Sequence, residues 1–129
     1  MLVRDILNKK GNKVFTSSPD TLIGEIANTL VKENIGAIVI IEKDIVVGIL
    51  SERDIVRGFT EKKSVRSTKA KELMTKNVIT CNTKNTTEEL LELMVKKHFR
   101  HIPVIQNNKL IGVVSIGDLV KDRTKRLKK

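Results

Sequence analysis

The chain has 129 residues, a formal net charge of +10 and 40% apolar residues, mostly isoleucine, valine and leucine. A chain of this length forms one domain with a single core, because folding buries roughly two-thirds of the surface that the unfolded chain exposes. No apolar run approaches the ~20 residues of a membrane span, and the N-terminus lacks a signal-peptide pattern. The single cysteine, Cys81, excludes an internal disulfide. These properties predict a soluble cytoplasmic protein.

The first half of the chain reads as alternating strands and helices. After the short extended stretch VFTSS, an amphipathic helix is indicated by apolar residues that recur every four positions: Leu22, Ile26 and Leu30. Thr21 is its predicted N-cap. Two β-rich runs follow, AIVII and IVVGILS, separated by the turn-forming letters EKD. A second helix is predicted to begin at Ser51, and the polar stretch 59–69 reads as a linker.

The second half repeats the first. Residues 14–59 align without a gap with residues 78–123 at an offset of 64, and eleven of the 46 positions are identical. Upstream, the segment VRDIL corresponds to AKELM, and the first copy has three extra residues around Lys10 and Gly11. Asn85 is the predicted N-cap of the repeated helix, with Glu88 three residues later. Each copy is therefore predicted to have the order β-α-β-β-α, and two copies suggest a fused pair about a pseudo-twofold axis.

The C-terminal letters KDRTKRLKK carry six Lys or Arg and one Asp, hence 6 − 1 = +5. Such a tail suits nucleic acid, an anionic surface or an acidic partner. The structural alternative, which we favour, is a solvated helix end where cations also suit the helix dipole.

Both copies contain the motif S-x-x-D where an apolar strand meets a helix: Ser51 with Asp54, and Ser115 with Asp118. One interpretation is a capping box, worth about 1 kcal/mol of helix stability. The other is a ligand site, because α/β proteins place ligands where a strand ends and a helix begins. Capping boxes favour the longer Glu or Gln, and both copies carry Asp. The pattern alone leaves the two interpretations equal.

The ordered motifs resemble a tandem pair of the cystathionine-β-synthase (CBS) domain family over about residues 3–122. The resemblance rests on VRDIL and AKELM, on the strings GILSERDIV and GVVSIGDLV, on IGAIVI and on RHIPV. It implies an α/β fold in which two β-α-β-β-α motifs, related by a pseudo-twofold axis, pack through their sheets into one module. The implied divisions are a first motif, a linker, a second motif and a basic tail, at residues 1–58, 59–69, 70–123 and 124–129.

The resemblance further implies a regulatory module that binds adenine nucleotides, with AMP, ATP and NAD(H) as candidates. Asp54 and Asp118 would accept hydrogen bonds from the ribose hydroxyls, and Ser51 and Ser115 would hold ribose or phosphate. The family's adenine slot falls on second-strand residues, here Ala37, Ile38, Ile102 and Pro103. The predicted set also includes an identical pair in the two extended stretches, Thr16 and Thr80.

The copies differ where phosphates would lie. Arg53 in the first copy corresponds to Gly117, and Gly36-Ala37 corresponds to Arg100-His101. We therefore select Arg53, Arg100 and His101 as phosphate candidates, since guanidinium suits phosphate oxygens. For Arg53 an exposed helix residue is an equal alternative. The uneven distribution predicts two non-equivalent sites.

Catalysis finds little support in the sequence. No histidine is expected beside Ser51 or Ser115 to activate either one. His98 and His101 lack neighbouring ligands for a metal set. We expect a non-enzyme without an essential metal, and a homodimer acting on an unidentified protein target. Nucleic-acid binding through the basic charge is the main rival, although the chain has almost no aromatic residues on which bases would stack. A purely structural dimerisation module is the third interpretation.

Overall fold

The structure is a computed structural model that describes residues 1–11 and 13–127, with side chains described as far as Lys121. The backbone forms two compact units. The first-repeat unit comprises Phe15–Val78, and the second-repeat unit comprises Met1–Val14 together with Ile79–Lys129. Each repeat thus carries its upstream helix in the unit of the other repeat. In the described part of the chain, no helix is both long and apolar enough to cross a membrane.

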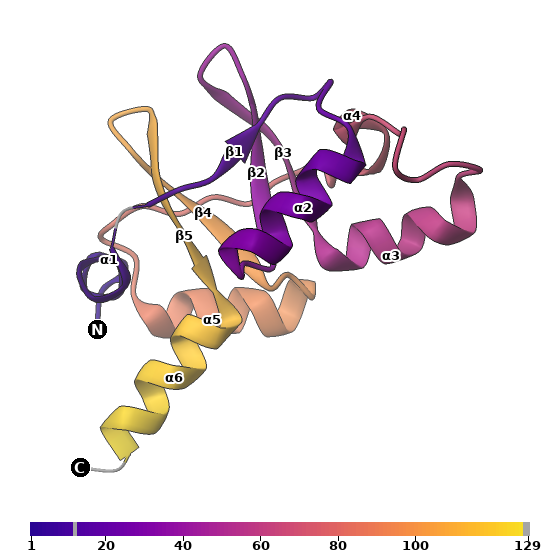
Figure 1. Ribbon diagram of the computed structural model, residues 1–129. Coiled ribbons are helices and arrows are strands. Elements are labelled where there is room, and N and C mark those ends of the chain that lie inside the picture. Colours follow the sequence, from indigo (N-terminus) through magenta and orange to yellow (C-terminus); the bar gives the residue numbers. More distant parts are fainter. Residues whose placement is uncertain (12, 128–129) are drawn as a thin grey trace. The chain divides into compact units, whose positions relative to one another are not determined.

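The first-repeat unit contains β1 (Thr16–Ser17), α2 (Ile23–Glu33), β2 (Ala37–Glu42), β3 (Ile45–Ser51), α3 (Glu52–Glu61) and α4 (Ala70–Leu73). Its sheet has the order β1-β2-β3, with β1 parallel and β3 antiparallel to β2. Figure 1 shows these three strands side by side, with α2 beside the sheet. The two-residue turn between β2 and β3 has positive φ at Lys43 and Asp44, as a tight hairpin requires.

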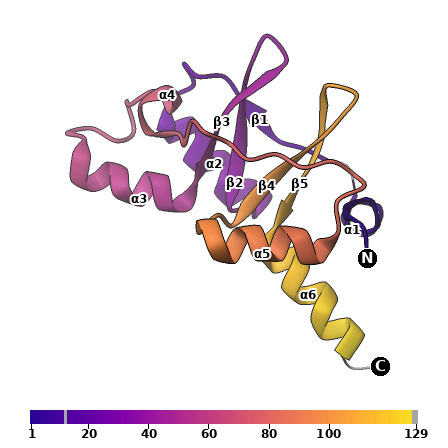
Figure 2. The ribbon, with the colours of Figure 1, turned by 180° about the vertical axis from the view of Figure 1, so that it is seen from behind.

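The second-repeat unit contains α1 (Val3–Lys10), α5 (Thr87–Lys97), β4 (His101–Gln106), β5 (Lys109–Ser115) and α6 (Ile116–Leu127). Strands β4 and β5 form an antiparallel hairpin that leads directly into α6, which packs against α5 (Figure 2). The stretch equivalent to β1 makes only an isolated parallel bridge, between Cys81 and Val104. The predicted element order is confirmed in the first repeat, and in the second it lacks only the first strand.

The buried apolar residues form two clusters, one in each unit, so the expectation of a single core is wrong. In the second-repeat unit, α1 buries Val3, Ile6 and Leu7 against the strands. In the first-repeat unit, α4 buries Ala70 and Leu73 in the same way. The apolar letters of VRDIL and AKELM are therefore the inner faces of these two helices.

The repeated strand glycines permit the close approach of these upstream segments. A Cβ atom on Gly48 would lie 2.5 Å from Met74 Sδ, and one on Gly112 would lie 2.6 Å from Leu7 Cδ2. These contacts explain why both strands carry a glycine at this position.

The two predicted N-caps are wrong by one residue. Helix α2 begins after Leu22, which supplies no side-chain cap; the N–H groups of Ile23 and Gly24 instead donate to the carbonyls of Thr68 (2.8 Å) and Arg66 (3.0 Å). Helix α5 is capped by Thr86, which forms a capping box with Glu89. The reason is tertiary: a distant backbone segment satisfies the first donors of α2, so no side chain is needed.

Candidate functional site

The turn from β3 into α3 holds the first serine–aspartate pair. The Ser51 N–H donates to Asp54 Oδ2 at 2.9 Å, and the Asp54 N–H donates to Ser51 Oγ at 3.4 Å. The serine hydroxyl also donates to Asp54 Oδ2 at 3.2 Å. These reciprocal bonds confirm the capping box, since the extended Ser51 ends the strand and satisfies the first turn of the helix.

The second pair has the same geometry between β5 and α6. The Ser115 N–H donates to Asp118 Oδ2 at 2.8 Å, and the Asp118 N–H donates to Ser115 Oγ at 3.1 Å. The repeated motif is therefore a repeated structure, with a carboxylate fixed at the junction of strand and helix in each unit.

The two aspartate carboxylates are paired with different cationic side chains. Asp54 Oδ1 accepts from Arg57 Nη1 at 3.0 Å, and the same guanidinium donates from Nη2 to the Leu73 carbonyl at 2.8 Å. Arg57 Nε also lies 3.4 Å from Glu61 Oε1. The Asp54 side chain is only 6% exposed, so both of its oxygens are engaged in a nearly closed environment.

Asp118 meets a lysine from α1 instead. Lys10 Nζ donates to Asp118 Oδ2 at 2.7 Å and to the Val113 carbonyl at 2.8 Å. The Asp118 side chain is 23% exposed, and no described group bonds to its other oxygen, Oδ1. In the second-repeat unit one carboxylate oxygen is therefore without a described hydrogen-bond donor.

The strands place further predicted residues beside these turns. Ala37 is the register partner of Ser51, and His101 is the register partner of Ser115. Both are half-buried. The next residues, Ile38 and Ile102, point to the opposite faces of their strands and belong to the two cores. Of the predicted adenine-slot residues, Ala37 thus lies on the same side of its sheet as the serine, and Ile38 and Ile102 do not; the phosphate candidate His101 lies on the serine side in the second-repeat unit.

Of three other predicted residues, Thr16 and Thr80 are exposed and Pro103 is buried within β4. Thr16 pairs with Val39 at the outer strand of the three-stranded sheet and is exposed. Thr80 is exposed next to Cys81, whose N–H donates to the carbonyl of buried Pro103 at 3.0 Å.

The basic candidates are unevenly placed. Arg53 is exposed in the first turn of α3. The Arg100 carbonyl accepts from the Ile116 N–H at 2.8 Å, which holds exposed Arg100 beside the first residue of α6. Burial lowers the pKa of His101 below its ordinary value; the Lys10 charge lowers it further, Asp118 raises it, and Arg100 lowers it. His101 is therefore neutral at pH 7, and the charges of Lys10, Arg100 and Asp118 all influence its pKa.

Sequence reasoning missed Lys10 and Arg57. Arg57 lies three residues after Asp54, a spacing that brings side chains together on a helix and that gave a usable signal. Lys10 lies in the three-residue insertion of the first copy, 108 residues from Asp118, so no local pattern pointed to it.

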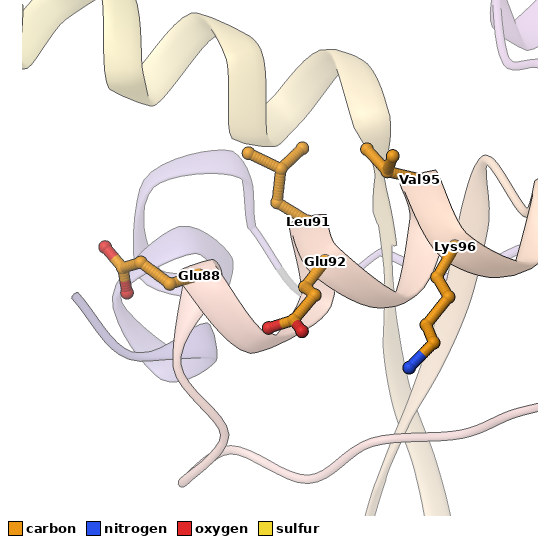
Figure 3. A pocket seen from close by; sticks show the side chains of 5 residues that line it. All are labelled: Glu88, Leu91, Glu92, Val95 and Lys96. Carbon is orange, nitrogen blue, oxygen red and sulfur yellow. The ribbon is translucent and has the colours of Figure 1, made fainter.

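The described surface also contains two hollows away from these turns. One of about 510 Å³ follows α5 and is lined by Glu88, Leu91, Glu92, Val95 and Lys96. Figure 3 shows Leu91 and Val95 pointing toward α6 and Glu88, Glu92 and Lys96 pointing elsewhere. The other, of about 350 Å³, lies between α2, α3 and residues 62–66. Neither is lined by a serine or aspartate of the repeated motif.

Among the described residues, no group of three or more His, Cys, Asp or Glu side chains is arranged to hold a metal ion. The backbone of α6 extends to Leu127. The side chains of the basic tail lie outside the described part of the chain, so the expectations for the tail stay predictions.

Comparison with known proteins identifies relatives along nearly the whole chain. The family model of the CBS domain matches residues 3–61 and 70–124. The CBS domain-containing protein YhcV of Bacillus subtilis is 32% identical over 107 residues, which cover 83% of this chain and 76% of that protein. The chain spans between 57% and 66% of several other curated relatives.

Solved structures share the fold. The CBS-domain containing protein ATU1752 from Agrobacterium tumefaciens superposes with a TM-score of 0.91 at 42% identity, covering 95% of this chain and 99% of that one. The CBS domain pair of protein MJ0100, in complex with 5′-methylthioadenosine and S-adenosyl-L-methionine, has a TM-score of 0.87 at 26% identity and covers 98% of both chains.

Proposed function

Because the chain belongs to the CBS domain family, we propose that it is a regulatory module that binds adenine nucleotides at its serine–aspartate turns. The observation that carries the proposal is the duplicated, pre-oriented carboxylate: Ser51 holds Asp54, and Ser115 holds Asp118, through the same reciprocal bonds. The solved complex of the MJ0100 pair with two adenosine-containing ligands supports the ligand class.

The chemistry of the turns suits a ribose. An ionised carboxylate accepts about four hydrogen bonds, and a vicinal diol supplies two donors from adjacent oxygens. The capping bond from the serine N–H engages one oxygen and fixes the carboxylate plane before a ligand arrives. This fixed orientation lowers the entropy cost of binding.

The ligand proposed for these turns is a phosphorylated adenine nucleotide, with AMP, ATP and NAD(H) as the candidates. The proposed action is a population shift: a ligand that binds one arrangement of the protein more tightly increases the population of that arrangement and changes affinity for a protein partner. Free adenine nucleotides are intracellular metabolites, so the proposal includes a cytoplasmic location and a regulatory, non-catalytic role.

The proposed function includes a homodimer, in which a second copy of the chain is the partner. Four valines are identical between the repeats at equivalent helix positions and are 52% to 83% exposed: Val31, Val56, Val95 and Val120. Each unit thus carries exposed apolar side chains on its helices, and such side chains are the kind that protein contacts cover. Light scattering should give twice the mass of one chain for the wild type, and Val56→Glu should reduce it; a monomeric wild type would contradict the dimer.

The deciding experiment for ligand binding is a thermal-shift series with AMP, ATP, NAD and NADH. The variants are Asp54→Asn and Asp118→Asn, in which asparagine keeps an acceptor for the serine N–H but loses the charge. A ligand at ~100 times its Kd should raise the melting temperature by on the order of 10 °C. At least one variant should lose that shift.

A matched control is Asp44→Asn, because Asn108 occupies the equivalent turn position with the same φ of 64°. The control should keep the full ligand shift. Absence of a shift with every nucleotide in the wild type would overturn the proposed function.

A further inference from the structure

The two upstream helices differ in length, and the difference places a charge at one site only. Helix α1 has eight residues and α4 has four. Both pass their repeat glycine at an equivalent point, with Leu7 against Gly112 and Met74 against Gly48. Helix α1 continues for one more turn beyond that point and ends at Lys10, whereas α4 has already ended.

Lys10 is anchored in a way that leaves it able to bind an anion. Its ammonium has three N–H donors, of which two are engaged by Asp118 Oδ2 at 2.7 Å and by the Val113 carbonyl at 2.8 Å. The Lys10 side chain is 36% exposed, and no described group accepts from its third donor. Beside it lies Asp118 Oδ1, which no described group engages. An open cationic donor and an open carboxylate oxygen are thus adjacent.

The surroundings strengthen the positive charge at this turn. Arg100 is held beside α6 by the bond from the Ile116 N–H. Both Lys10 and Arg100 act on His101, and their combined effect with burial keeps that imidazole neutral at pH 7. Lys10, Arg100 and Asp118 therefore carry a net charge of 1 + 1 − 1 = +1 at the turn.

The equivalent turn in the first-repeat unit lacks this arrangement. Gly36 and Ala37 replace the arginine and histidine. The Arg57 guanidinium is already engaged by Asp54, the Leu73 carbonyl and Glu61. Asp54 is almost closed to solvent, with both oxygens occupied.

We propose that Lys10 is a phosphate-binding residue of the Asp118 turn and makes this turn the site selective for phosphorylated adenine nucleotides. The inference rests on the proposed function and deepens it. The ribose binds at Asp118 Oδ1 while Lys10 keeps its bond to Oδ2 and gives its third N–H to a phosphate of the same ligand. Its four-carbon stem provides the small adjustment this needs. The Asp54 turn does not select for phosphate in this way.

The test compares AMP with adenosine, which differ only in the phosphate. Titration calorimetry gives both dissociation constants for the wild type and for Lys10→Met. The variant should bind AMP roughly tenfold more weakly, the usual scale of one charge-assisted hydrogen bond, and adenosine within about twofold of the wild type. Lys10→Arg should retain most of the preference for AMP.

The matched control is Lys109→Met, which removes one positive charge from the same unit at the exposed first residue of β5. It should leave both constants unchanged. If Lys10→Met fails to fold, Lys10→Gln replaces it, because the amide preserves a neutral donor near Asp118. Asp118→Asn should weaken both AMP and adenosine, because both carry the ribose, and Asp54→Asn should preserve the preference for AMP.

The outcomes separate the two proposals. Wild-type binding with an AMP-to-adenosine preference that Lys10→Met leaves intact overturns the role of Lys10 and spares the proposed function. Equal weakening of both ligands by Lys10→Met also overturns it, because the residue would then only maintain the site. Failure of the wild type to bind either ligand overturns both.

Discussion

The Arg57 guanidinium lies 3.0 Å from the Asp54 carboxylate, and the aspartate side chain is only 6% exposed. Because the capping bonds engage the other carboxylate oxygen, Arg57 is the cation that neutralises a charge the fold has almost enclosed. It also ties α3 to the end of α4 through the Leu73 carbonyl.

Removal of Arg57 is therefore expected to destabilise the first-repeat unit. Arg57→Met should lower the free energy of unfolding by about 1–2 kcal/mol, a value reduced for the 43% exposure of the arginine. Urea unfolding measures the change. Arg53→Met, on the same helix and exposed, is the control and should change stability by less than ~0.5 kcal/mol. Equal effects of the two variants would contradict a special role for the Arg57–Asp54 pair.

Gly48→Ala should destabilise the protein by about 1–3 kcal/mol, because the new methyl group would meet Met74 Sδ at 2.5 Å and the Thr75 carbonyl at 3.1 Å. Thermal unfolding measures the loss. Combining Gly48→Ala with Met74→Ala should recover part of it, since the closest clash disappears.

Gly117→Ala is the control for that substitution. A Cβ atom at Gly117 meets only Ser115 Oγ at 3.5 Å, and the position is helical. The variant should be neutral or more stable by up to about 1 kcal/mol. Destabilisation by Gly117→Ala as large as that by Gly48→Ala would show that the steric argument is wrong.

As the pH falls below 6.5, the free energy of unfolding should decrease because of His101. The folded protein holds the pKa of His101 below its ordinary value of 6.5, so the unfolded chain takes up the proton first as the pH falls. The contribution of His101 to stability is thus fully present above pH 6.5. It declines as the pH falls toward the pKa of His101 in the folded protein, and below that pKa it no longer changes. Melting temperatures measured across this range should fall less steeply in His101→Gln than in the wild type. His98→Asn, at the exposed left-handed end of α5, should retain the wild-type slope.

The thiol of Cys81 should react slowly with disulfide reagents in the native protein. Burial raises its pKa to about 12, which leaves almost no thiolate near neutral pH. Because it is the only cysteine, one absorbance trace reports it without interference. Reaction at pH 8 should be many times faster in urea than in buffer, whereas equal rates would mean that Cys81 is accessible in the native state.

Local patterns predicted the repeated elements well. Continuous β-rich runs located β2, β3, β4 and β5, apolar residues spaced by four located the helices between them, and turn-forming residues between the runs marked both tight turns. The spacing from Ser51 to Asp54 offered a capping box as one of two equal interpretations, and the hydrogen bonds confirm that the capping box forms. These features depend on residues only a few positions apart in the chain, so the local sequence is enough to predict them.

Helix starts were predicted less well, for a physical reason. Thr21 looked like a cap, but the N–H groups at the start of α2 donate to the backbone of residues 66 and 68, which no local pattern places there. The stretch 59–69 looked like a loose linker, yet Val65 and Thr68 are buried. Polar composition alone did not reveal that this segment serves as the cap of another helix.

The sequence by itself determined the duplication, the element order and the carboxylate at each strand-to-helix turn, because each follows from spacing along the chain. Only the tertiary structure decided which cation each carboxylate meets. Arg57 reaches Asp54 from the same helix, whereas Lys10 reaches Asp118 across 108 residues because α1 packs on β5. Long-range packing of an apolar helix face positions that ammonium, and so it makes two turns with the same motif chemically different.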